Sequence, residues 1–348
     1  MAIIDKPSDY FNTKLYSGNS TDDTSITGVG FQPDWLWIKE RTNTSGHQLQ
    51  DVIRGATKQL FSNETQAEAT NTTKVKSFDS DGFTLGTSGS VNVSGDTYVA
   101  WNWKAGTSFT NDASATGIGT IDSTGSVSQE AGFSIISYTG NGTANQSVAH
   151  GLGATPKIIL IKNRTTAGYW CMTNPRFVSV SDPNILYLQT TAAEADDTNI
   201  NGTTAPSSTV FGVDDYGAVN TSGNAHIAYC FTPIQGYSSM GTYVGNGSSD
   251  GSYIHLGFKP AFVMIKKTSG TGNWCLFDNK RGVNGAMIQL NPDNTNADNT
   301  LDYIDFLAQG FKCRNTASDK NASGGSYIYM AFAENPFVAS NFNAATAR

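Results

Sequence analysis

Residues 33–39 read PDWLWIK, a proline followed by an apolar segment that ends in lysine. The same plan returns as PKIILIK at residues 156–162 and as PAFVMIK at residues 260–266. From one copy to the next the lysines keep the spacing of the prolines, so the register between copies is constant through this segment. Self-similar segments at long intervals indicate one supersecondary unit that is built more than once.

Each copy also begins and ends alike. The entry reads YSGN at residues 16–19, YTGN at 138–141 and YVGN at 243–246. A turn of the form Asn-x-Ser-Gly precedes the last apolar segment, at residues 92–95, 220–223 and 321–324. Asn and Gly tolerate the left-handed backbone of tight turns, and serine can bond to its own backbone. The sequence therefore predicts three copies of one unit.

The segments within each copy have the patterns of β-strands. The closing segments, residues 98–103, 226–231 and 327–332, are apolar along one side, which predicts strands with one face on a core. The proline-led segments are apolar on both faces and are expected to lie centrally, covered on both sides. Helical periodicity is scarce. We expect an all-β protein of three tandem antiparallel β-sandwich repeats, of jelly-roll or lectin-like type.

The expected boundaries follow from these copies and from one change in composition. Residues 1–106 are assigned to the first repeat, 132–234 to the second and 235–348 to the third. Residues 107–131 are rich in Ser, Thr, Gly and Ala and poor in apolar residues. They are interpreted as an interdomain linker or as an arm laid over a neighbour. Residues 233–236 leave little slack, so the second and third repeats are expected to hold a fixed relation.

The composition excludes several classes of protein. The net charge is −7 and the basic residues form no cluster, which argues against a nucleic-acid partner. The first residues lack a secretory signal, and no apolar stretch is long enough to span a bilayer, so we expect no membrane insertion and assembly in a cytoplasm. Charged residues make up only 15% of the chain, so the surface must be polar through Ser, Thr, Asn and Gly. Such a surface suits contacts with other subunits or with sugars.

Catalytic motifs are missing from the sequence. It has no nucleophile elbow, zinc-protease motif or phosphate-binding loop, and the four histidines lack acidic partners at recognisable spacing. A glycosidase needs two carboxyl groups facing one sugar, yet no acid recurs at one place in all three copies. The four cysteines lack metal-ligand spacing and are expected to fill β cores. We expect no enzyme activity, cofactor or metal.

One polar motif occurs in two of the copies. Asp51 and Arg54 belong to DVIRG at residues 51–55, and Asp278 and Arg281 belong to DNKRG at residues 278–282. The second copy has Asn174 at the position of the aspartates. One interpretation is a loop in which Asp and Arg form hydrogen bonds with each other and the following glycine ends the turn. The other is a presented site, with Asp51, Arg54, Asp278 and Arg281 gripping a partner or a glycan.

Tryptophan is concentrated in the first copy, which holds Trp35, Trp37, Trp101 and Trp103. Aromatic rings can stack on sugars as readily as they fill a core. Trp35 and Trp37 share a face and align with apolar residues of the other copies, namely Ile158, Leu160, Phe262 and Met264. Packing is therefore the favoured interpretation.

Four phrases of the first copy together resemble a repeat of virion structural proteins from marine tailed bacteriophages. They are YSGN from residue 16, GFQPDWLWIKER from residue 30, SFDSDGFTLG from residue 77 and YVAWNWK from residue 98. The other copies match this repeat more loosely. The resemblance covers most of the chain and implies a virion component, with other virion proteins as partners. It carries over no catalytic residues.

Within that class we expect a tail-associated fibre or adhesin that displays its repeats to the host surface. Fold-level analogy with phage fibres adds a homo-oligomer, such as a trimer, and a host surface glycan is a further expected partner. The alternatives are a head decoration or cement protein that stabilises the capsid and, third, a polysaccharide-degrading enzyme.

Overall fold

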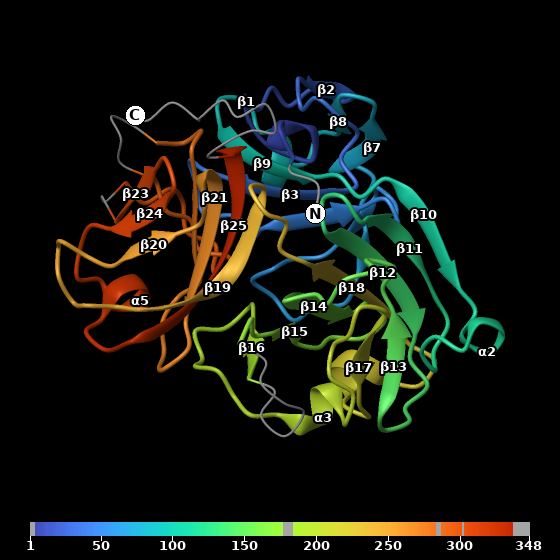
Figure 1. Ribbon diagram of the computed structural model, residues 1–348. Coiled ribbons are helices and arrows are strands. Elements are labelled where there is room, and N and C mark those ends of the chain that lie inside the picture. Colours follow the sequence, from blue (N-terminus) through green and yellow to red (C-terminus); the bar gives the residue numbers. More distant parts are fainter. Residues whose placement is uncertain (1–3, 177–183, 283–286, 301–302, 337–348) are drawn as a thin grey trace.

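The computed structural model describes residues 4–176, 184–282, 287–300 and 303–336. Its elements are mostly β-strands in antiparallel sheets, with a few single-turn helices (Figure 1). The predicted all-β class is confirmed. None of the helices in these residues is long and apolar enough to cross a membrane.

An inner sheet with one order of strands occurs in each repeat. Its first strand lies beside its last, the proline-led strand comes next, and the hairpin partner of that strand is fourth. In the first repeat the order is β1 (Phe11–Ser17), β9 (Thr97–Trp103), β3 (Trp35–Glu40) and β4 (Gln48–Asp51). In the second it is β12 (Phe133–Thr139), β18 (Ala225–Phe231), β14 (Ile158–Asn163) and β15 (Trp170–Thr173), with β16 (Ile185–Tyr187) beyond. In the third it is β19 (Ser238–Val244), β25 (Ser326–Pro336), β21 (Phe258–Lys267) and β22 (Cys275–Asp278).

A smaller outer sheet packs on each inner sheet. The outer sheets are β2 (Thr24–Thr27), β8 (Gly82–Leu85) and β7 (Val75–Asp79); β13 (Gln146–Ala149) and β17 (Val210–Val213); and β20 (Tyr253–His255), β24 (Gly310–Cys313) and β23 (Ile304–Leu307). A separate apolar cluster fills the space between the two sheets of each repeat. The predicted sandwiches are therefore present.

Short elements complete the described chain. They are η1 (Pro7–Asp9), β5 (Lys58–Gln59), β6 (Ala69–Thr70), α1 (Gly89–Asn92), α3 (Thr198–Asn201), α4 (Gly217–Asn220) and α5 (Ser318–Asn321). The helical turns α1, α4 and α5 stand just before the last strand of each repeat and end on the asparagine of the Asn-x-Ser-Gly turn.

Hydrogen bonds link the entry turn of each repeat to the turn before its last strand. The side-chain oxygen of Asn92 accepts the backbone N–H of Asn19 at 2.9 Å, and the equivalent bonds in the other repeats measure 2.9 and 3.0 Å. The hydroxyl of Tyr16 donates to the carbonyl of Val91 at 2.9 Å. A Cβ atom on Gly18 would stand 2.1 Å from the carbonyl oxygen of Val93, so only glycine fits there. These contacts explain why the two phrases recur together.

A fourth apolar cluster joins all three repeats. In each repeat, alternate residues of the last and the proline-led strands point into it, and the residues between them face the outer sheet. From the last strands it receives Val99, Trp101 and Trp103; Ile227, Tyr229 and Phe231; and Ile328, Met330 and Phe332. From the proline-led strands it receives Trp35 and Trp37; Ile158 and Leu160; and Phe262 and Met264. The three sandwiches therefore share one central core.

This shared core settles two expectations about the strands. The proline-led strands are covered on both faces, as predicted, and all residues of β3 and β14 are buried. The apolar face predicted for each closing strand does lie on a core, but the opposite face is covered as well, because all but the first residue of β9 and of β18 are buried. The tryptophans of the first copy pack in this core, as favoured above. A void of only about 10 Å³ remains at its centre, about the space of one water molecule.

Equivalent hydrogen bonds close the three repeats into a ring. Each set links the second repeat to the first, the third to the second, and the first to the third. One set donates from Gly168 N–H to Thr65 O (2.8 Å), from Gly272 to Thr191 (2.9 Å) and from Ser45 to Thr295 (3.0 Å). Another donates from Glu68 N–H to Arg164 O (2.9 Å), from Glu194 to Thr268 (3.1 Å) and from Asp298 to Arg41 (3.0 Å). Head-to-tail contacts that close in this way give the single chain the plan of a trimer.

Side-chain hydrogen bonds also link neighbouring repeats around this ring. The indole N–H of Trp170 donates to the Phe61 carbonyl at 2.8 Å, and that of Trp274 donates to the Tyr187 carbonyl at 3.1 Å. His47 takes this place in the first repeat, with Nε2 2.9 Å from the Asn291 carbonyl oxygen. Of the lysines that close the proline-led segments, Lys162 and Lys266 donate to neighbouring-repeat carbonyls at 2.9 and 3.0 Å. Burial lowers the pKa of each of the three, Lys39 included, to about 8.

The interpretation of residues 107–131 as a linker is wrong. They form β10 (Thr107–Asn111), α2 (Ala113–Thr116) and β11 (Ser123–Ser128), and β11 pairs along its whole length with β12 of the second repeat. We call this segment the ribbon. It extends the inner sheet of the second repeat to seven strands. The alternative of an ordered arm is closer, although the arm is part of the sheet.

Candidate functional site

The Asp–Arg pair of the first repeat is buried at the contact with the second repeat. The side chains of Asp51 and Arg54 have no exposed surface. Asp51 accepts the backbone N–H groups of Ile53 and Arg54 at 3.0 and 2.9 Å and forms an ion pair with the Arg54 guanidinium. The hydroxyl of Tyr229 in the second repeat donates to the same carboxylate at 2.6 Å. The pair therefore braces an interface.

The pair of the third repeat has the same role. The side chains of Asp278 and Arg281 are also without exposed surface, and their ion pair measures 2.6 Å. The indole N–H of Trp101 in the first repeat donates to Asp278 at 3.0 Å, and its ring lies 5.6 Å from the Arg281 guanidinium carbon. Of the two interpretations of the motif, the structure shows the hydrogen-bonded loop and offers no presented grip for a glycan at these four residues.

The same register explains why the second repeat has asparagine here. Strand pairing makes Trp101, Tyr229 and Met330 equivalent positions. The first two donate hydrogen bonds to a carboxylate of the neighbouring repeat, whereas methionine has no donor. A buried carboxylate without this donor would be costly. Asn174 is neutral, and its amide donates to Glu194 at 2.6 Å.

Histidine and cysteine are also used inside the fold. The indole N–H of Trp37 donates to His47 Nδ1 at 2.8 Å, so Nε2 carries the proton and donates to the Asn291 carbonyl. Burial lowers the pKa of His47 well below its usual value. All four cysteines are buried and free, and burial raises the thiol pKa of Cys230 to about 12. These groups are poorly placed to act as nucleophiles or bases.

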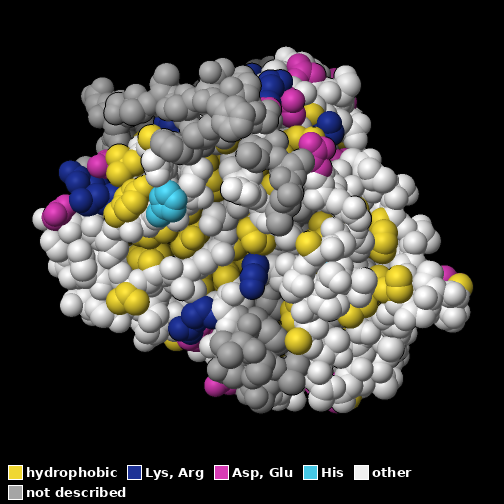
Figure 2. Space-filling view, in the orientation of Figure 1, with side chains coloured by type: hydrophobic (Ala, Val, Ile, Leu, Met, Phe, Trp, Pro, Cys, Tyr) yellow, Lys and Arg dark blue, Asp and Glu magenta, His cyan; other side chains and the backbone are white. Residues whose placement is uncertain are grey.

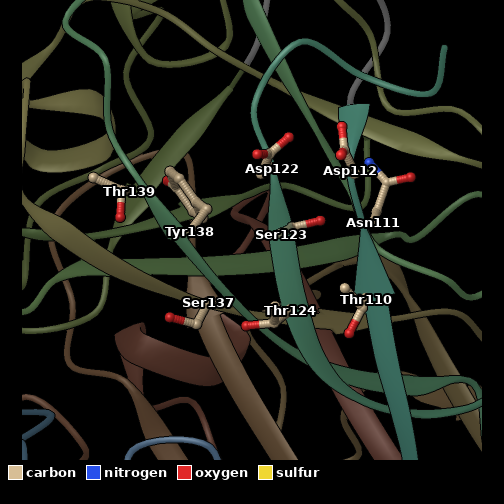
Figure 3. Close-up of a pocket in the computed structure, with 9 residues that line it drawn as sticks. All are labelled: Thr110, Asn111, Asp112, Asp122, Ser123, Thr124, Ser137, Tyr138 and Thr139. Atoms are coloured by element: carbon tan, nitrogen blue, oxygen red, sulfur yellow. The ribbon is translucent and has the colours of Figure 1, made fainter. Parts of the chain in front are cut away.

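An open groove of about 340 Å³ lies on the ribbon and the adjoining strand β12 (Figure 3). This volume falls in the range of small-ligand sites. The groove is lined by Thr110, Asn111 and Asp112 from β10 and its end, Asp122, Ser123 and Thr124 from the start of β11, and Ser137, Tyr138 and Thr139 from β12. The lining is mostly hydroxyl and carboxylate groups, and it includes no basic residue.

Six of these residues form a grid on one face of the sheet. Thr110, Thr124 and Ser137 are register partners on three neighbouring strands. Two residues further along each strand, and so on the same face, come Asp112, Asp122 and Thr139. Figure 3 shows the hydroxyls in a row across the strands, with both carboxylates on the same side of this row. We call these six residues the hydroxyl–carboxylate grid.

The first turn of α2 fixes the two carboxylates. Asp112 accepts the backbone N–H of Ala115 at 3.0 Å and the hydroxyl of Ser114 at 2.7 Å. Asp122 accepts the backbone N–H of Ala113 at 2.8 Å. The Ser114 hydroxyl and then the Ala115 N–H lower the pKa of Asp112, so this group is ionised at neutral pH.

This arrangement suits hydrogen bonding better than proton transfer. The acid of a glycosidase has a raised pKa, and the shift at Asp112 is in the opposite direction. Among the described residues, no three acidic, histidine or cysteine groups gather as metal ligands would. The groove can therefore accept and donate several hydrogen bonds to a polar molecule.

This site was not predicted from the sequence, because residues 107–131 have the composition of a linker. One signal was available in Gly125. A Cβ atom there would stand 2.0 Å from the carbonyl oxygen of Ile135. A glycine in the interior of a strand can mark such a close approach of another backbone.

The family comparison treats the repeats and the ribbon as one unit. The model of one family, described as a domain of unknown function (DUF7483), matches residues 6–336. Comparison with curated proteins and with solved structures found no match. The matched span runs without a break through all three repeats, as does the ring of contacts described above. The chain belongs to the DUF7483 family.

Proposed function

We propose that this protein is a non-enzymatic structural component of a phage virion, and that it serves as a tail-associated fibre or adhesin. The observation that carries the proposal is that most of the reactive side chains have structural roles inside the fold, whereas an open polar groove lies on the surface of one repeat. The buried ion pairs and His47 brace contacts between repeats and the cysteines fill the cores of single repeats, while the ribbon adds an open polar groove to one repeat. The resemblance of the repeat phrases to virion proteins supports the same assignment.

The surface supports an attachment role. Uncharged atoms dominate the face shown in Figure 2, and charged side chains are scattered over it. A low density of charge suits contacts made through hydrogen bonds and shape. The ring plan gives one chain the form that other fibres obtain from three, so it could occupy a threefold position alone or as part of a larger homo-oligomer.

The test is the position of the protein and its affinity for host cells. Antibody labelling or a reconstruction of the particle should place it on the tail, and purified protein should bind host cells with saturation. Absence from the tail together with failure to bind host cells would refute the adhesin.

A head decoration protein is the second candidate, and the pseudo-threefold ring favours it. A chain with three similar faces can lie on a threefold position of a capsid and contact three neighbours in nearly equivalent ways. The number of copies per particle separates the two candidates, because decoration predicts a number set by capsid symmetry.

A further inference from the structure

The groove presents its polar groups at a regular spacing. Neighbouring strands lie about 4.8 Å apart, so the hydroxyls of Thr110, Thr124 and Ser137 follow one another at about this interval. One unit of an extended polysaccharide has a comparable length. A saccharide that crosses the strands would therefore meet a hydroxyl group at each step.

The hydroxyls on the ribbon are available for a ligand. Those of Thr110 and Thr124 are on exposed residues and have no partner in the part of the chain that the structure describes. The Ser137 hydroxyl accepts only a long bond, 3.4 Å, from Arg164. A hydroxyl can both donate and accept, which matches the hydroxyl groups of sugars.

The charge of the groove selects among sugars. Asp112 and Asp122 supply two carboxylates, and each has one oxygen that accepts no bond from the described chain. The nine lining residues include no lysine or arginine, and Arg164, which reaches Ser137 from outside the lining, is paired with the Glu68 carboxylate at 2.9 Å. Uronates, sialic acids and phosphorylated sugars would be repelled, whereas the hydroxyl groups of neutral sugars and the ammonium groups of amino sugars would be attracted.

We propose that the hydroxyl–carboxylate grid binds a neutral or amino-bearing oligosaccharide that runs across β12, β11 and β10. The sugar hydroxyls exchange hydrogen bonds with the row of Thr110, Thr124 and Ser137. The two carboxylates accept hydrogen bonds from a hydroxyl or ammonium group beside that row. This inference deepens the proposed attachment function and rests on it for its biological meaning, but the chemistry of the groove is testable by itself.

The experiment is calorimetric titration of the full-length protein with soluble oligosaccharides of three charge classes. The probes are a neutral manno-oligosaccharide, a chitosan oligosaccharide and an oligouronate. The variants are Thr124→Val, which keeps the shape and removes a hydroxyl, and Asp122→Asn, which keeps an acceptor for Ala113 N–H and removes the charge. The matched control is Thr27→Val, an exposed strand residue on the outer sheet of the first repeat.

The neutral or the amino probe should bind, and the uronate should not. Thr124→Val should weaken binding about 3- to 10-fold, as the loss of one hydrogen bond predicts. Asp122→Asn should weaken the amino probe by at least about 10-fold, and Thr27→Val should change nothing. Far-UV circular dichroism and thermal unfolding should match among all variants.

Three outcomes would overturn the proposal. They are no binding of the neutral and amino probes at millimolar concentration, equal binding of the uronate, or binding that is abolished by a chelator and so belongs to a cation. The proposed function fails separately. If Thr124→Val and Asp122→Asn still attach to host cells, the protein can be an adhesin but the groove is not its binding site. If the protein binds sugar but is absent from the tail, the groove is a sugar site but the protein is not a tail adhesin.

Discussion

The three repeats should fold and unfold as one unit, because each lends part of its surface to the shared core. The perturbation is removal of the third repeat by ending the chain at residue 234. Four aromatic rings of the remaining chain pack on Phe262 or Phe332 of the third repeat, with ring centres 5.2 to 6.1 Å from the centres of those two rings. They are Phe11, Trp101, Trp103 and Phe231.

The cost of this truncation can be estimated from those rings. Each aromatic side chain buries roughly 150–250 Å². If the cut uncovers about half of that on four rings, about 400 Å² of apolar surface enters water, which costs about 10 kcal/mol at 25 cal/mol/Å². The whole free energy of unfolding of a typical protein is about 5–15 kcal/mol. The truncated chain also loses the bonds from His47 to Asn291 and from Trp101 to Asp278, so it should not fold.

Scanning calorimetry of the full chain is the assay, with near-UV circular dichroism of the truncated chain beside it. The full chain should show one transition whose calorimetric and van't Hoff enthalpies agree. The truncated chain should lack a near-UV signal and a cooperative transition. Resolved separate transitions in the full chain, or a truncated chain that melts cooperatively at the temperature of the full one, would refute the shared core as the basis of stability.

Three further predictions concern single residues. Asp51→Asn leaves a buried guanidinium poorly compensated and should lower the free energy of unfolding by about 3–5 kcal/mol in urea titrations. Asp22→Asn removes one partner of an exposed ion pair and should leave the free energy of unfolding almost unchanged. Equal effects of the two substitutions would contradict the bracing role. Gly18→Ala forces a contact of 2.1 Å with a carbonyl oxygen and should lower the free energy of unfolding by about 1–3 kcal/mol, measured by thermal unfolding. The control is Gly89→Ala, whose new Cβ meets nothing closer than 3.5 Å and which should be neutral or slightly stabilising. A larger loss of stability in Gly89→Ala than in Gly18→Ala would contradict the steric explanation. Burial lowers the pKa of His150 to about 4, so the folded state binds fewer protons than the unfolded state between pH 4 and 6.5 and the neutral ring stabilises the fold less as pH falls through that window. The loss of stability between pH 7 and pH 5 should therefore be about 2 kcal/mol smaller in His150→Gln than in the parent, and an unchanged difference would show that this ring is not neutral in the fold.

The strand patterns predicted much of the fold, because burial on a sheet face leaves a period of two in the sequence. The alternate residues of the last strands identified the face that enters the shared core, and the doubly apolar proline-led strands identified positions covered on both sides. What covers the second face could not be predicted, since an apolar face packs equally well on its own outer sheet or on another repeat. The non-directional character of the hydrophobic effect leaves this choice open.

The candidate site was harder to predict, for two physical reasons. An Asp–Arg motif has the same sequence whether it is presented or buried, and the deciding groups, Tyr229 and Trp101, lie far away in the chain. The ribbon has few apolar residues because only one of its faces reaches the core: Phe109, Ile121 and Val127 pack against the apolar cluster of the second repeat, while most of the other face is exposed. Period-two patterning detects burial, so it does not detect strands such as β10.

The differences among the repeats point to the ribbon as the place to seek function. The change from aspartate to Asn174 in the second repeat is explained by its neighbour, because Met330 offers no donor where Tyr229 and Trp101 do. A difference of this kind in one repeat is matched by a difference at the contacting position of the neighbouring repeat. The ribbon is an addition to the second repeat, and one of its faces packs in the apolar cluster of that repeat through Ile121 and Val127. In the described chain the inner sheets of the first and third repeats end at β1 and β19 without further strands, and their sandwiches are complete. The exposed hydroxyls and fixed carboxylates on the other face of the ribbon take no part in this packing, and a ligand would explain them.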